Sequence, residues 1–255
     1  MYLKKETKEM LKSLEQDYVD LIPELRQFFS KSYIKRLEPM APRPKNLIGQ
    51  NSIVFIQANL FRSKMLVSGY IDGLNNKNPL TTTILVRALY ETTGALAYYL
   101  KKYNQYLAGE LSEEGLNKYL YSLYLGIRDK GPLTEAPDPI GVMSLIDAVD
   151  HYLKAKYQIR DSNFRENYEA LSEICHPNSF GYMLSHKIDK SDNHTVKFRG
   201  ETEPYLINTF SIWYFDICSR LYQQIYSELR LKVEKNEELP FKEYRIGDLG
   251  VNLQT

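Results

Sequence analysis

The sequence predicts an all-α protein, a helical bundle of six to eight helices with a candidate small β-hairpin insert. Apolar residues recur three and four positions apart along most of the 255 residues, which is the spacing of amphipathic helices. An alternating pattern is confined to residues 182–200, around Val196 and Phe198, so this segment is either a hairpin or a loop. With no internal repeat, we expect a single helical domain over residues 1–255, with its core bundle in residues 50–235.

The N-terminal part, residues 1–45, is predicted to be a helical segment followed by a connector. Pro23 predicts a kink or break, so the segment is one long helix or two shorter ones. A cluster of three prolines after residue 38 favours an extended connector. The apolar side chains of residues 4–36 lie at helical spacing, at Leu11, Leu14, Tyr18, Leu21, Ile22, Leu25 and Phe29.

The core bundle is predicted to begin with two long apolar helices. Asn51 or Ser52 is a suitable N-cap for the first, because its side-chain oxygen can accept a bond from a free backbone N–H. The turn-forming residues Asn75–Pro79 separate it from the second helix, which Thr81 or Thr82 can cap. Both segments are apolar over much of their circumference, so we expect them to pack together as the central hairpin.

Three further helices are predicted before the candidate strands. Ser112 caps the first of them, which ends in a loop with three prolines. Val142–Tyr157 forms the second, with apolar residues along one side. Asp161 or Ser162 caps the third, FRENYEALSEICH.

The C-terminal helix is predicted to be the longest, from about Pro204 to Lys235. At about 1.5 Å per residue it would span roughly 45 Å, enough to cross the bundle or to pair with a second copy in a homodimer. Residues 236–255 lack this pattern and are predicted to form a loose tail. The apolar positions of the helix form a continuous seam of Leu206, Phe210, Trp213, Ile217, Leu221, Ile225 and Leu229.

The composition indicates a globular protein and narrows the choice of partners. Lysine and arginine number 33 against 32 acidic residues, so a net charge of +1 gives no overall attraction to nucleic acid or to anionic membranes. No apolar run reaches the roughly 20 residues of a membrane span, and the N-terminus lacks a signal-peptide pattern. We therefore expect a cytoplasmic protein with no membrane association. Cys175 and Cys218 are too few for a disulfide framework and are expected to be reduced.

Tyrosine is over-used, with 21 residues against 1 tryptophan. Tyrosine combines a large apolar body with a polar tip, which suits half-exposed positions between helices. We expect the rings to pack between helices with their hydroxyls at the surface. A self-association surface is the alternative.

A charged pair, Arg87 and Glu91, lies within the otherwise uncharged run ILVRALYETTGALAYYL. The four-residue spacing puts both side chains on one face of a helix, and burying either alone would cost several kcal/mol. We therefore expect them to pair inside the core. His176, in the string LSEICHPN, lies at a helix end because Pro177 disfavours helical geometry at the residue before it. It is the natural third partner of the pair.

These three residues have the chemistry of a metal-free phosphodiester cleavage site. The last carbonyls of a helix favour the protonated imidazolium of His176, which makes it a candidate general acid and base. Arg87 would bind a phosphate or carboxylate while Glu91 holds the guanidinium. The alternative is a hydrogen-bonded network that ties two helices together. No nucleotide, dinucleotide, esterase or zinc-protease motif occurs in the sequence, so no cofactor is implied.

Two other groupings are weaker. Asp147, Asp150 and His151 share a helical face at metal-compatible spacing, but polar residues opposite an apolar stripe are typical of a solvated face. We therefore expect no metal site. Scattered basic residues either form a groove for RNA or are ordinary solvated charges; they are Arg62, Lys64, Arg160, Arg165, Lys187, Lys190, Lys197 and Arg199.

The strings ILVRALYETTGALAYYL and LSEICHPNSFGY resemble those of a family of uncharacterised bacterial and phage-associated helical proteins. In that family an Arg-x-x-x-Glu helix precedes a Ser-Glu-x-x-His-Pro helix end, and the family is in turn similar to the HEPN superfamily of helical bundles. The resemblance covers roughly residues 50–220. One departure is clear: the HEPN nuclease motif has its arginine four to six positions before the histidine, whereas Arg165 is eleven positions before His176, roughly 16 Å along a helix. An active site would take Arg87, or an arginine of a second subunit, instead.

The resemblance implies a metal-independent ribonuclease or toxin-type effector of bacterial anti-phage defence, acting on RNA as a homodimer. Arg87, Glu91 and His176 would be its catalytic residues. The residues placed to bind substrate are Ser172, Asn178 and Tyr182. The alternative is a non-catalytic interaction or sensor protein of the same fold, which binds a protein partner or a small anionic ligand.

Overall fold

The computed structural model describes residues 1–39, 47–131, 134–159, 162–177, 182, 186–188, 191, 195–198, 204–237, 239 and 241–245. Within these ranges it has eight α-helices and four short strands, which confirms an all-α helical bundle with a small β insert. In chain order the elements are α1 (Lys5–Leu14), α2 (Gln16–Ser32), β1 (Ile34–Pro39), α3 (Ile48–Asn75), α4 (Pro79–Leu107), α5 (Glu113–Leu125), α6 (Val142–Tyr157), α7 (Phe164–Cys175), β2 (His186–Ile188), β3 (Val196–Phe198), α9 (Pro204–Asn236) and β4 (Phe241–Arg245).

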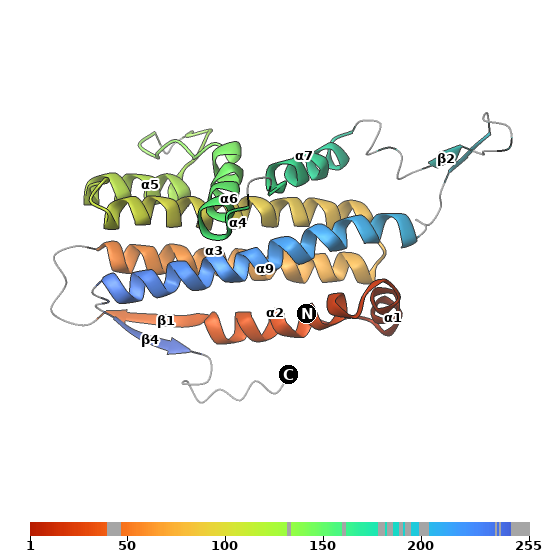
Figure 1. The fold of residues 1–255 in the computed structure, drawn as a ribbon, viewed down its shortest axis with the longest axis horizontal. Helices are drawn as coiled ribbons and strands as arrows, with labels where there is room; N and C mark the ends of the chain where they lie inside the picture. Colours follow the sequence, from red (N-terminus) through yellow and green to blue (C-terminus); the bar gives the residue numbers. More distant parts are fainter. Residues whose placement is uncertain are drawn as a thin grey trace.

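Three long helices, α3, α4 and α9, run side by side along the long axis of the molecule (Figure 1). Helix α4 is the centre of the bundle, because it packs against α3, α9, α6 and α7. The predicted central hairpin of α3 and α4 is therefore confirmed. Helix α2 covers the opposite side, against α9, and α5 packs on α4 and α3. No helix among the described residues is long and apolar enough to cross a membrane.

The start of α4 differs from the prediction. Its N-cap is Asn78, whose side chain accepts a hydrogen bond from the backbone N–H of Thr81 at 3.0 Å. Pro79 occupies the first helical position, where its missing N–H costs nothing. Thr82, one of the two predicted caps, lies inside the helix and donates its hydroxyl to the carbonyl oxygen of Pro79 at 2.8 Å.

The start of α3 also lies earlier than predicted, at Ile48 instead of Asn51 or Ser52. Ser52 is fully buried, and its hydroxyl lies 2.6 Å from the hydroxyl of Tyr99 on α4. The polar group that suggested a cap therefore links the two central helices instead.

Three other predictions of helix ends are confirmed. Ser112 caps α5 by accepting from the backbone N–H of Gly115 at 3.1 Å. Helix α6 covers the predicted range Val142–Tyr157. Helix α7 ends at Cys175, and His176 after it has extended backbone geometry. The N-cap of α7 is Asn163, one residue after the predicted Ser162, while Asp161 lies outside the described residues.

The N-terminal segment forms two helices that separate at Glu15, whereas Pro23 lies inside α2. After α2 the chain forms β1, which pairs antiparallel with β4, so that Leu37 lies opposite Glu243. Strand β1 replaces the end of the segment predicted to be helical, while residues 40–45 of the predicted connector lie outside the described residues. The sequence predicts a loose tail after residue 235, and β4 corrects this prediction. Residues 246–255 of the predicted tail lie outside the described residues.

The hairpin alternative for residues 182–200 is confirmed. Strands β2 and β3 pair antiparallel, with His186 opposite Phe198 and Ile188 opposite Val196. The hairpin projects away from the helical bundle beyond α7 (Figure 1).

The length of α9 agrees with the prediction, but its buried face is turned relative to the predicted seam. Ile225 and Leu229 are buried as expected, whereas Trp213 is 47% exposed and Ile217 is only partly buried. The side chains of Leu206 and Phe210 lie outside the description. The residues of α9 that fill the core are Ile212, Tyr214, Phe215, Cys218, Tyr222, Ile225, Tyr226, Leu229 and Val233.

Several tyrosines are buried up to their hydroxyls, contrary to the expectation that these reach the surface. Tyr70, Tyr90, Tyr99, Tyr103 and Tyr222 are the largest of the fully buried side chains. The hydroxyl of Tyr103 donates to a carboxylate oxygen of Glu237 at 2.9 Å. A buried hydroxyl that forms a hydrogen bond fixes the orientation of its ring more narrowly than packing of the ring alone.

Candidate functional site

The Arg87–Glu91 pair forms as predicted, but at the edge of the core. The Nε atom of Arg87 lies 3.6 Å from Oε1 of Glu91, and the two side chains are 30% and 28% exposed. The neighbouring residues Val86, Leu89 and Tyr90 point into the core instead. The expectation of full burial is therefore wrong, because the pair occupies the flank of α4 that α7 covers only in part.

Tyr168 on α7 is the third partner of the pair. Its hydroxyl accepts hydrogen bonds from Nε and Nη2 of Arg87, at 3.3 and 3.2 Å, and donates to Oε1 of Glu91 at 2.9 Å. Burial raises the pKa of Tyr168, Arg87 opposes this rise and Glu91 adds to it. The tyrosine thus remains a neutral donor and acceptor that joins α7 to α4.

The guanidinium of Arg87 stays charged in this setting. Burial acts to lower the pKa of Arg87, but the hydrogen bonds to Tyr168 and the nearby carboxylate of Glu91 outweigh it and raise the pKa. A guanidinium has five N–H donors, so its two bonds to Tyr168 do not exhaust it.

The end of α7 lies against Arg87. Burial raises the pKa of the Cys175 thiol, while the charge of Arg87 and a hydrogen bond from it act in the opposite direction. Cys175 is the last residue of α7 and His176 follows it directly. The structure therefore brings Arg87 next to the helix end that the sequence singles out.

His176 itself does not occupy the expected third position. Its side chain is exposed, and its backbone N–H donates to the carbonyl oxygen of Ser172 at 3.2 Å. Among the described contacts of Arg87 and Glu91, none involves the imidazole. Tyr168 takes the place that the sequence assigns to His176, because it lies two turns before the end of α7 on the face that contacts α4, whereas His176 follows the helix with extended backbone and its side chain is exposed.

The three residues predicted to bind substrate lie in different settings. The hydroxyl of Ser172 donates to the carbonyl oxygen of Tyr168 one turn earlier, at 2.9 Å, so it is used within α7. Tyr182 is exposed. Asn178 lies outside the described residues.

A pocket of about 530 Å³ adjoins the pair and shares Glu91 with it. Arg62 on α3 lines this pocket and donates from Nε to the hydroxyl of Thr92 at 3.2 Å. Asn59 donates to the backbone carbonyl of Thr92 at 3.0 Å. A second guanidinium therefore lies on the same side of α4 as Glu91.

Several residues of the two weaker predicted groupings, the acidic cluster on α6 and the basic groove, form ion pairs or hydrogen bonds with nearby side chains. Asp147 accepts from Arg165 at 3.0 Å, and Asp150 accepts from the hydroxyl of Ser162. No cluster of metal-binding side chains occurs among the residues that the structure describes. Of the predicted basic groove, Arg165 is neutralised by Asp147 and Glu169, and Arg160, Lys190 and Arg199 are not among the described residues.

Tyr168 is the residue of this site that the sequence analysis misses. It precedes Cys175 by seven positions, two turns of a helix, and therefore lies on the same face of α7. That spacing, read together with the end of the helix at Cys175, is the signal that indicates Tyr168.

Comparison of the chain with protein-family models, with curated proteins and with solved structures finds no match.

Proposed function

We propose that the protein is a HEPN-like, metal-independent ribonuclease or toxin-type effector of bacterial anti-phage defence that acts in the cytoplasm. Arg87 would bind a phosphate of the RNA, Glu91 would orient the guanidinium, and His176 would act as general acid and base. The observation that carries this proposal is the convergence of the Arg87–Glu91 pair on the last turn of α7, which His176 directly follows.

The surroundings of Arg87 suit phosphate binding. The guanidinium is charged, partly exposed and held in place by Tyr168 and Glu91, and it has donors left for an incoming oxygen. Arg62 lies at the neighbouring pocket and would contact an adjacent phosphate of the same strand.

The position of His176 suits proton transfer. It follows Cys175, which contacts Arg87, and its side chain is exposed to solvent. RNA supplies its own nucleophile, the 2′-hydroxyl, so cleavage requires a proton acceptor for that group and a proton donor for the leaving 5′-oxygen. An exposed imidazole next to a bound phosphate can exchange a proton with either.

A homodimer belongs to this proposal. Trp213 and Leu231 on α9 are exposed although both are large and apolar, and such side chains on one helix suit a contact with a second copy. Light scattering after gel filtration measures the mass directly; a monomer at all concentrations would remove this part of the proposal.

The test is cleavage of a mixed RNA pool in EDTA. We expect cleavage by the wild type, loss of cleavage in His176→Ala and Arg87→Gln, and unchanged melting of His176→Ala because its side chain is exposed. His186→Ala on the hairpin is the matched histidine control and should cleave normally. No cleavage by the wild type, or equal cleavage by wild type and His176→Ala, contradicts the catalytic assignment.

One observation favours a second function: the third partner of the Arg87–Glu91 pair is Tyr168 and not His176. In that case the protein is a non-catalytic module that binds an anionic ligand or a protein partner through Arg87. Fluorescence anisotropy with labelled RNA distinguishes the two: a bound and uncut RNA that Arg87→Gln releases supports the binding module.

A further inference from the structure

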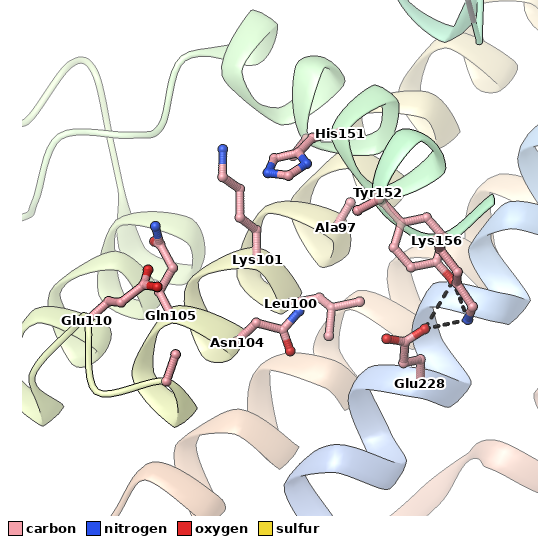
Figure 2. A pocket seen from close by; sticks show the side chains of 13 residues that line it. Ala97, Leu100, Lys101, Asn104, Gln105, Glu110, His151, Tyr152, Lys156 and Glu228 are labelled. Carbon is pink, nitrogen blue, oxygen red and sulfur yellow. Dashed lines mark hydrogen bonds and ion pairs between the residues drawn. The ribbon is translucent and has the colours of Figure 1, made fainter. Parts of the chain in front are cut away.

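A second pocket lies between α4, α6 and α9, away from the candidate site (Figure 2). Its volume is about 590 Å³, within the range of roughly 300 to 1,000 Å³ typical of small-molecule sites. Lys101 in this pocket is fourteen residues after Arg87 on α4, about 21 Å along the helix. The base of the pocket is apolar and well packed, since Ala97, Leu100 and Ala148 are 2%, 2% and 4% exposed.

Two amide side chains of the pocket are fixed with their oxygens already bonded. Lys232 donates to Oδ1 of Asn104 at 2.7 Å, and Lys102 donates to Oε1 of Gln105 at 3.1 Å. An amide whose oxygen is taken by a lysine offers its NH₂ group to a ligand. Asn104 and Gln105 therefore present donors to the pocket.

Lys101 and His151 add two further donors. In Figure 2 their side chains extend to the same side of the pocket, from α4 and α6 respectively. Neither side chain has an ion pair or hydrogen bond to any other residue that the structure describes. The exposed carboxylate of Glu110 lies at the mouth near Gln105.

The opposite wall holds a carboxylate whose charge is already balanced. Lys156 donates to Glu228 and to the hydroxyl of Tyr152, and Lys232 lies 3.5 Å from the same carboxylate. Burial acts against ionisation of Glu228, but the hydrogen bond and charge of Lys156 outweigh it and lower the pKa of this group. Glu228 is therefore held ionised by two lysines and does not repel an anion strongly.

The charges of the lysines and carboxylates that line the pocket balance, and the donors are concentrated on one wall. Lys101 and Lys156 line the pocket with the two carboxylates Glu228 and Glu110, and Lys232, which pairs with Glu228 without lining the pocket, adds one positive charge nearby. Because Lys156 is used by Glu228, Lys101 and the side-chain N–H donors of His151, Asn104 and Gln105 remain for a ligand that has several acceptor oxygens. The apolar base requires that the rest of the ligand be a compact body with an apolar face.

We propose that this pocket binds a nucleoside monophosphate. The phosphate would lie among Lys101, His151 and the amide groups of Asn104 and Gln105, and the nucleoside would cover the apolar base formed by Ala97, Leu100 and Ala148. The site is independent of the proposed nuclease residues, because it lies further along α4 and uses α6 and α9 instead of α7.

Isothermal titration calorimetry of the full chain tests this site. The ligands are the four nucleoside monophosphates, the matching nucleosides and inorganic phosphate. We expect at least one monophosphate to bind, with its nucleoside and inorganic phosphate each at least about tenfold weaker, since each lacks one half of the recognised group. Lys101→Ala should weaken binding by about tenfold or more.

Two matched variants separate a built site from general attraction to positive charge. Lys154→Ala removes an exposed lysine of α6 that does not line the pocket and should leave binding unchanged. Ala155→Trp fills the pocket from an exposed position and should abolish binding without changing the melting temperature. The proposal is overturned if no monophosphate binds, if inorganic phosphate binds as tightly as the nucleotide, or if Lys154→Ala weakens binding as much as Lys101→Ala.

Discussion

Tyr168 and Arg87 are joined by two hydrogen bonds, from Nε and Nη2 of the guanidinium to the tyrosine hydroxyl, at 3.3 and 3.2 Å. The two residues are 81 positions apart in the sequence, and the contact joins α7 to the central helix α4. The same hydroxyl donates to Glu91 at 2.9 Å. The hydroxyl of Tyr168 therefore forms hydrogen bonds with both members of the charged pair. These bonds set the orientation of the guanidinium that is proposed to bind substrate.

Tyr168→Phe should destabilise the protein by about 1–2 kcal/mol, because it removes hydrogen bonds to charged groups that water replaces only in part at this half-buried site. Urea denaturation followed by circular dichroism measures the change. Tyr124→Phe, at an exposed tyrosine of α5, is the matched control and should stay within about 0.5 kcal/mol of the wild type. Equal stability of the two variants would show that the Tyr168 hydroxyl contributes nothing.

Gly94→Ala should destabilise the protein although alanine is the better helix former. A Cβ atom at position 94 would lie 2.7 Å from the backbone carbonyl oxygen of Leu145, so α4 and α6 would have to separate. The expected net loss is about 1–3 kcal/mol by thermal or urea denaturation. Gly69→Ala on α3 is the control, since its Cβ meets only the flexible end of Leu85 at 3.1 Å. A Gly94→Ala protein as stable as Gly69→Ala would contradict the close approach of the two backbones.

The two cysteines should differ in reactivity. Cys218 is fully buried, and burial raises the pKa of its thiol to about 12, with a hydrogen bond to Thr93 acting in the opposite direction. Cys175 is partly exposed at the end of α7. In the native protein at pH 8, we expect a thiol reagent to label Cys175 and to reach Cys218 only after denaturation. Mass spectrometry of the labelled peptides measures both; rapid native labelling of Cys218 would show that the α4–α9 contact opens readily.

The stabilising effect of Glu228 should depend on pH. The pKa of Glu228 is lowered from its usual 4.5, because Lys156 and Lys232 outweigh the effect of burial. A carboxylate with a lowered pKa in the folded state stabilises the fold above its unfolded pKa, and this contribution is lost as pH falls through the folded value. The stability difference between wild type and Glu228→Gln should therefore be constant near neutral pH and shrink below about pH 4.5.

Urea denaturation at several pH values from 7 to 3 measures this difference. Glu135→Gln in the loop before α6 is the control, because Glu135 is exposed and makes no described ion pair. Its stability difference from the wild type should stay near zero throughout. A Glu228→Gln difference that does not change with pH would contradict the ionic role of Glu228.

The helix ends that the sequence predicts well are those set by neighbouring residues. Ser112 reaches a backbone N–H three residues on, and Pro177 restricts the residue before it, so both effects are complete within one helical turn. Ser52 shows the limit of this reasoning: as a polar residue it suggests a cap, but its hydroxyl contacts Tyr99, which is distant in the sequence.

By itself, the sequence determined the all-α class, the ranges of α6 and α9 to within a residue or so, and the pairing of Arg87 with Glu91 across one helical turn. Only the tertiary structure decided which residue joins that pair, which face of α9 is buried, and that β1 pairs with β4. Caps, prolines and i to i+4 contacts act over a few residues, so a local pattern contains them. Contacts between distant segments depend on how the helices pack, and Tyr168 reaches Arg87 only because α7 lies against α4.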